Sequence, residues 1–162
     1  MSEKEQFIKA LEMEFPITLR VLKAYPEDKL DWRPHEKSKS AKELAWNFVT
    51  EQYILHGALK GTIDFQNIPK SPMTMKEILD AFEKVQGETV AKFKESNDVD
   101  LTGKTLKFFV APKTMGDVPF WEIAWMMLKD AVHHRGQFSV YLRMAGGMVP
   151  SIYGPSADEP WM

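Results

Sequence analysis

The stretch Ser40–Leu59, SAKELAWNFVTEQYILHGAL, carries the signals of an amphipathic helix from start to end. Ser40 followed by Glu43 is the capping-box pattern, in which the two side chains bind the free amides of the first helical turn. Apolar residues recur at helical spacing along the stretch and are predicted to face a core: Leu44, Phe48 and Leu55. Gly61 lies two residues after Leu59, and glycine is the residue that most often ends a helix. The stretch is therefore predicted to be a helix.

Three further segments carry the same signals, over about 3–24, 74–95 and 119–145. Ser2 with Glu5 and Thr74 with Glu77 repeat the capping box, and Pro119 suits a first helical position. Four amphipathic helices bury their apolar stripes most simply against one another. The predicted fold class is therefore all-α, a four-helix bundle with long connections, forming a single domain over 1–162.

Two segments outside these helices also carry structural signals. The region 96–118 is the least regular, and 104–110 within it could form a short strand. The tail after Gly147 is rich in apolar and turn residues. We therefore predict that it docks on the bundle through Ile152, Tyr153 and Trp161.

Charge and composition exclude several classes of function. The 21 basic and 23 acidic residues are interspersed and give a net charge of -2, so there is no basic stripe of the kind that nucleic-acid binding needs. The start, MSEKEQF, lacks the apolar core of a signal peptide, and no apolar run approaches the roughly 20 residues of a membrane span. We therefore expect a cytoplasmic protein without nucleic-acid or membrane partners. Cysteine is absent, so the chain has no thiolate of its own.

The chemically informative run is Asp130–Gln137, DAVHHRGQ. Asp130 and His134 are four residues apart and share one helix face, an arrangement that can chelate a divalent metal or form a pair of base and orienting carboxylate. Arg135 points elsewhere and is predicted to be a structural ion-pair partner. The other three histidines are more simply read as structural or surface residues: His35, His56 and His133.

Two parts of the chain resemble one known family. The run KDAVHHRGQFSVYLRMAGGMVPSIYGPSADEPW, over 129–161, and the pair DWRP and SAKELAWNFVTE, over 31–34 and 40–51, are similar to the last and second helices of DinB/YfiT-like proteins. The resemblance implies a four-helix bundle that is often a homodimer. It also implies a divalent metal, commonly zinc or nickel, held by one histidine on the second helix and two on the fourth. Some members transfer a low-molecular-weight thiol to electrophiles.

The resemblance carries a ligand set that this chain keeps only in part. Asn47 falls where the family has its second-helix histidine, Asp130 falls at the earlier position on the fourth helix, and His134 keeps the family residue. The predicted metal ligands are therefore Asn47, Asp130 and His134. Glu51, one turn after Asn47, is either a substitute oxygen ligand or base, or a solvated or ion-paired surface residue. One nitrogen and two oxygens favour labile binding of zinc, nickel or manganese.

Two functions remain open from the sequence. The first is a metal-dependent transferase or hydrolase that acts on a small molecule, with a low-molecular-weight thiol as one candidate cosubstrate; no residue is assigned as catalytic. The second is a metal-free ligand-binding or dimeric interaction module with a degenerate metal site, in which Asp130 and His134 form a buried hydrogen-bonded pair.

Overall fold

Four long helices form the body of the protein in the computed structural model, which describes residues 1–162. They are α1 (Glu3–Lys23), α2 (Ala41–Lys60), α3 (Met75–Glu95) and α5 (Phe120–Met144). The smaller elements are a 3-10 turn, η1 (Glu27–Lys29), the short helix α4 (Asp98–Thr102) and the strands β1 (Thr105–Ala111) and β2 (Thr114–Pro119). The all-α prediction is confirmed, with one small hairpin added to it.

The three predicted capping boxes are present. Ser2, Ser40 and Thr74 each accept a hydrogen bond from the backbone three residues on, and the glutamate at that position reaches back to the cap amide. Gly61 ends α2 with a left-handed backbone, φ 97°, which glycine adopts without steric cost. These local hydrogen bonds explain why the starts of three helices are readable from the sequence.

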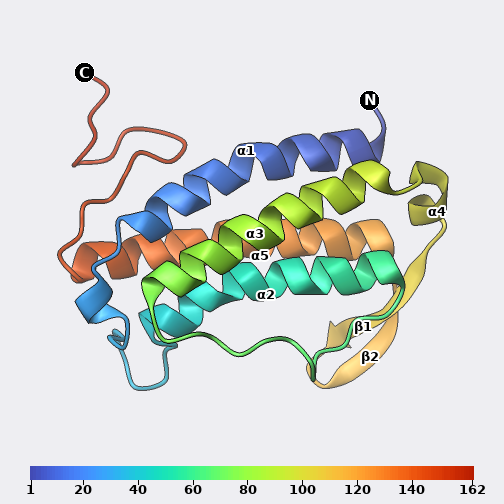
Figure 1. Cartoon of the computed structure of the whole chain (residues 1–162), viewed down its shortest axis with the longest axis horizontal. Helices are drawn as coiled ribbons and strands as arrows, with labels where there is room; N and C mark the ends of the chain where they lie inside the picture. Colours follow the sequence, from blue (N-terminus) through green and yellow to red (C-terminus); the bar gives the residue numbers. More distant parts are fainter.

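The helices pack so that neighbours in sequence are not always neighbours in space. α2 lies between α3 and α5, and α1 packs against α3 and α5 (Figure 1). The link from α1 to α2, which contains η1, therefore crosses an end of the bundle to the diagonal position. The hairpin and α4 make the corresponding crossing from α3 to α5 at the opposite end. This arrangement places α2 and α5 side by side along their length.

The hairpin shows where the sequence reading was incomplete. The expected strand is β1, which begins at Thr105, but its partner β2 was not predicted. β2 pairs antiparallel with β1 although it contains Gly116 and ends at Pro119, which are poor strand formers. Pro119 is the cap residue rather than the first residue of α5, a difference of one position.

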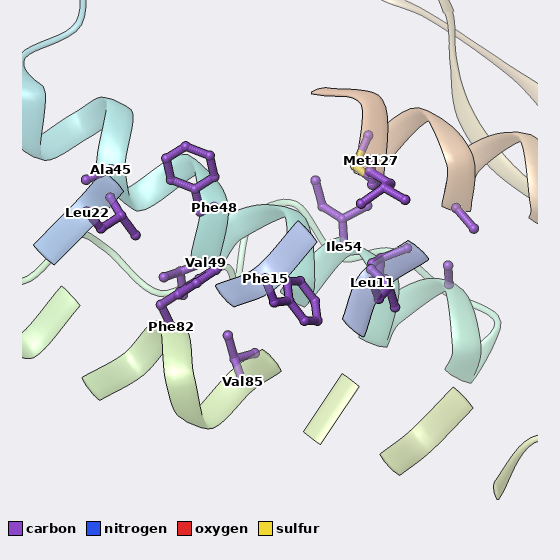
Figure 2. Packing of buried hydrophobic residues seen from close by; sticks show 14 of the residues in the cluster. Leu11, Phe15, Leu22, Ala45, Phe48, Val49, Ile54, Phe82, Val85 and Met127 are labelled. Atoms are coloured by element: carbon purple, nitrogen blue, oxygen red, sulfur yellow. The ribbon is translucent and has the colours of Figure 1, made fainter. Parts of the chain in front are cut away.

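A continuous apolar core fills the space between the helices. Figure 2 shows its centre, where Phe15, Phe48 and Phe82 come from three different helices. The core includes the three apolar positions of α2 predicted from helical spacing, Leu44, Phe48 and Leu55, and buried residues of the other helices such as Phe7, Leu11, Leu22, Ile78, Val85 and Phe93. None of the helices combines the length and apolar character that crossing a membrane requires.

The tail docks on the bundle through polar contacts more than apolar ones. Ile152 packs against the core as predicted, and the hydroxyl of Tyr153 reaches Arg135 and Glu14. The prediction for Trp161 is wrong, because this side chain is 63% exposed and makes no hydrogen bond or aromatic contact, whereas Tyr153, which is equally exposed, is held by its hydroxyl. Ion pairs of Glu159 with Arg20 and of Asp158 with Arg143 hold the tail instead.

Candidate metal centre

The packing of α2 against α5 brings four polar side chains together inside the bundle. Asn47 and Glu51 lie one turn apart on α2, and Asp130 and His134 lie one turn apart on α5. All four line a cavity of about 270 Å³, together with Lys39, Thr50, Ile54 and Met127. The structure therefore gathers Asn47, Asp130 and His134, as the sequence predicts, and adds Glu51 to them.

His134 is the centre of the group. Its Nδ1 lies 2.7 Å from Oε1 of Glu51 and 3.8 Å from Oδ2 of Asp130. Its Nε2 lies 3.3 Å from the side-chain nitrogen of Asn47. The imidazole is therefore in contact with the other polar residues of the group through both ring nitrogens.

Lys39 fixes the direction of these hydrogen bonds. An ammonium can only donate, and Nζ of Lys39 lies 2.7 Å from Asn47, so the atom that faces it is the amide oxygen. The amide nitrogen of Asn47 then donates to Nε2 of His134. Nδ1 carries the proton of the neutral imidazole and donates to Glu51. One chain of hydrogen bonds thus runs from Lys39 through Asn47 and His134 to Glu51.

Glu51 is the least satisfied member of the group. Its side chain is almost fully buried, and its second oxygen, Oε2, has no hydrogen-bond partner. Burial raises the pKa of Glu51 to about 7, although the hydrogen bond from His134 opposes this shift. The same hydrogen bond is the main reason that the pKa of His134 is raised. A buried carboxylate oxygen without a partner is costly and marks a position where a cation would be stabilised.

The donor atoms are close enough to share one metal ion. One ligand atom from each of Glu51, Asp130 and His134 lies within 4.8 Å of the others. Two carboxylates and one imidazole suit zinc, nickel and manganese, and their two negative charges match a divalent ion. The residues present therefore fit a divalent metal. The amide oxygen of Asn47 is already bound by Lys39, so the ligand role of Asn47 stays a prediction.

The remaining sequence candidates lie outside this group. Arg135 is buried and pairs with Glu14 at 2.7 Å, which confirms its structural role. His133 is exposed and bonds Gln137, and His35 bonds a backbone amide of its own loop. Lys39 was missed by the sequence reading, because its contact to Asn47 depends on the loop before α2 and not on a helical spacing.

Comparison with known proteins agrees with this architecture. The sequence profile of the DinB family matches residues 1–161. The chain belongs to the DinB family. Relatives in the family have diverged widely: the uncharacterized protein YrdA of Bacillus subtilis is 24% identical over 157 residues, which cover 96% of this chain and 90% of YrdA.

Two solved structures share the DinB-family fold with this chain. A DinB-like protein from Bacillus cereus superimposes with a TM-score of 0.77 at 24% identity, covering 92% of this chain and 97% of its own. The DinB-like protein YjoA of Bacillus subtilis gives a TM-score of 0.72 at 19% identity, covering 88% and 94%. At these identities the likeness describes the fold and leaves the chemistry to the residues of the site.

Proposed function

We propose that this DinB-family protein binds a divalent metal ion through Glu51, Asp130 and His134. The protein is then a transferase or hydrolase that acts on a small molecule at this site. The observation that carries the proposal is the buried Glu51 carboxylate, which has an unpartnered oxygen beside a histidine and a second carboxylate. An anionic group buried in this way is stabilised most directly by a cation.

Glu51, Asp130 and His134, the triad of proposed ligands, form a site that is open to solvent on one side. Asp130 is half-buried, whereas Glu51 is buried, so the group extends from the core to the surface of the bundle. A second cavity of about 410 Å³ is also lined by His134 and Lys39, together with Gln137 and Tyr141. The two cavities together offer space for a small molecule next to the triad.

The residues of the site have separate roles in this proposal. The bound metal would supply Lewis acidity and lower the pKa of a water molecule or thiol. Lys39 holds the amide of Asn47, and Asn47 contacts the imidazole of His134, so both act as positioning residues. Since the chain has no cysteine, a reaction at sulfur requires a low-molecular-weight thiol as cosubstrate.

Titration calorimetry with manganese, zinc and nickel tests the metal. We expect the wild-type protein to bind at least one of these ions and the double variant Asp130→Ala/His134→Ala to bind none of them. His133→Ala is the matched control, because it removes an exposed neighbouring histidine outside the triad. Equal heats for the wild type and the double variant would exclude the proposed site.

A metal-free binding module is the second candidate function. The hydrogen-bond chain from Lys39 to Glu51 supports it, because the chain satisfies both ring nitrogens of His134 without a metal. In that case a chelator leaves the melting temperature unchanged, and Asp130→Ala leaves calorimetric heats unchanged because there are none. A chelator-induced fall in the melting temperature of the purified protein would instead favour the enzyme.

We also propose a homodimer, by likeness to the family alone, and a cytoplasmic location, which the absence of cysteine fits. Sedimentation equilibrium tests the first, with a mass of twice 18.7 kDa as the expected result. Fractionation of the source cells tests the second.

A further inference from the structure

Another polar cavity, separate from the two beside the candidate metal centre, lies on the side of α2 that faces α3. It has a volume of about 420 Å³ and lies between the C-terminal half of α2, the second half of α3 and the loop after α2. His56, on α2, is five residues after Glu51, which places it roughly 140° around the helix from the candidate metal centre. The two sites are therefore separate.

His56 is a buried histidine with one ring nitrogen left over. Its Nε2 lies 2.8 Å from the hydroxyl of Thr89, and that hydroxyl lies 2.8 Å from the backbone oxygen of Val85. The single hydroxyl proton of Thr89 goes to the carbonyl, which can only accept, so Nε2 of His56 must carry a proton and donate. Nδ1 is then an acceptor. Nδ1 makes no hydrogen bond and is not among the fully buried polar atoms without a partner. It is therefore accessible from the cavity that His56 lines.

Three unpaired charged side chains line the same cavity as this acceptor. Lys60 lies one turn after His56 on α2, and Glu88 and Lys92 lie one turn apart on α3. All three line the cavity, and none of them takes part in an ion pair or a side-chain hydrogen bond. Their charges act on His56, whose pKa is lowered mainly by burial and further by Lys92 and Lys60. His56 is therefore neutral and can accept a proton donor.

The wall formed by the loop is fixed. The backbone oxygen of Thr62 lies only 2.8 Å from where a side chain on Gly57 would begin, so the glycine lets the loop close on α2. Asp64 accepts hydrogen bonds from the amides of Gln66 and Asn67 and from the Asn67 side chain. Its carboxylate is thus used to shape the loop, and Glu88 is the carboxylate that remains available to a ligand.

We propose that this cavity binds a small zwitterion of the α-amino acid class. An ammonium group donates to both Nδ1 of His56 and the carboxylate of Glu88, and a carboxylate group accepts from Lys60 and Lys92. A ligand of this kind uses every unpaired group of the cavity and leaves its net charge unchanged. A simple anion would leave His56 and Glu88 facing an acceptor, and a simple cation would leave two ammonium groups without partners.

Nuclear magnetic resonance of the His56 ring nitrogens tests the proposal, with His56→Gln used to assign the signals. The probes are the free amino acids at millimolar concentration, followed by the N-acetyl and the amide derivative of the one that binds best. We expect a free amino acid to shift the Nδ1 signal. Each derivative should bind at least about tenfold more weakly, because each lacks one charged group. Binding of the N-acetyl derivative as tight as that of the amino acid would overturn the proposal, as would no shift with any free amino acid.

Two pairs of variants locate the binding. Glu88→Gln and Lys92→Gln are each expected to raise the dissociation constant about tenfold. Glu95→Gln and Lys84→Gln change exposed residues of the same helix outside the cavity and are expected to leave it unchanged. Equal affinities for all four variants would place the ligand elsewhere. The experiment is done without added metal, so its outcome is independent of the proposed enzyme.

Discussion

His134 and Arg135 are adjacent on α5, yet they belong to two buried polar groups of opposite character. Arg135 points toward α1, where its guanidinium contacts Glu14, Thr18 and the hydroxyl of Tyr153. His134 points toward α2, where its partner Glu51 keeps one buried oxygen without a hydrogen bond. The first group is complete within the chain, and the second is not.

This difference distinguishes a polar group that only stabilises the fold from a polar group that can also bind a ligand. Folding leaves few buried polar atoms without partners, so a polar group that satisfies itself needs no further explanation than stability. A group that leaves a carboxylate oxygen unpartnered lowers stability, and a ligand that neutralises the oxygen restores it. Substitutions in the Arg135 group should therefore only lower stability, whereas the His134 group should let a bound ligand raise it.

Arg135→Met should give the largest change in the free energy of unfolding. Removing the guanidinium leaves the Glu14 carboxylate with only the Tyr153 hydroxyl as a side-chain partner, and should lower the free energy of unfolding by about 3–5 kcal/mol, as for other broken buried ion pairs. Urea denaturation measures the loss. Arg143→Met is the control, since its solvent-screened pair with Asp158 should contribute far less to stability. Similar losses for the two variants would contradict the distinction drawn between the Arg135 group and surface pairs.

Metal addition should stabilise the protein, and it should do so through the His134 group alone. At a free metal concentration 100-fold above the dissociation constant, the stability should rise by about 2.7 kcal/mol, and a chelator should reverse the gain. Glu51→Gln removes a carboxylate ligand and should abolish the rise, whereas Tyr153→Phe should keep it. Differential scanning calorimetry with and without metal measures both. A full rise in the Glu51→Gln variant would exclude Glu51 as a ligand.

The pH dependence of the metal-free protein should reveal the same group. Burial raises the pKa of Glu51 to about 7 from its ordinary value of 4.5, so the folded state holds this proton more tightly than the unfolded state. Its stabilising effect is complete below pH 4.5 and is lost as the pH rises through 7. The raised pKa of His134 acts in the same direction above 6.5.

The stability of the metal-free protein should therefore fall by roughly 2 kcal/mol between pH 5 and 7 because of these two groups. Thermal unfolding in the presence of a chelator measures the fall. Glu51→Gln cannot titrate and should flatten the curve, while Glu95→Gln, an exposed control, should not. A wild-type curve that rises over this range would show that Glu51 is ionised at low pH.

Tyr153→Phe should give the smallest effect. The change removes the hydroxyl that bonds Arg135 and Glu14 but keeps the ring that packs over the guanidinium, 5.0 Å away. The expected loss is about 1 kcal/mol, because the two hydrogen bonds lie near the surface and each contributes at the low end of the usual range. Urea denaturation would detect it, and a loss as large as that of Arg135→Met would mean that the tail carries most of the group's stability.

The sequence predicts those features that depend on neighbours along the chain. The three capping boxes and the apolar stripes need only residues three or four apart, so the helices and the all-α class follow from them. The pairing of Asp130 with His134 is also a spacing within one helix. By contrast, the choice of Glu51 as the partner of His134, and of Lys39 as the partner of Asn47, depends on how α2 packs and on the loop before it.

The hairpin and the tail illustrate the same limit. β2 pairs through backbone hydrogen bonds with β1, and these override the poor strand propensity of its glycine and proline. Trp161 reads as an anchor because it is large and apolar, but the nearby carboxylates Asp158 and Glu159 secure the tail by binding arginines, so the indole stays exposed. Both outcomes depend on contacts between distant residues.

The link between Tyr153 and Arg135 makes the tail part of the protein's resistance to proteases. A protease that cleaves the backbone before Tyr153 would detach the phenol from the guanidinium and leave the ion pair with Glu14 open to water. The damage from one surface cut would thus reach the interface of α1 and α5. Degradation of this protein is then expected to begin at its last fifteen or so residues and to proceed by cooperative unfolding rather than by gradual trimming.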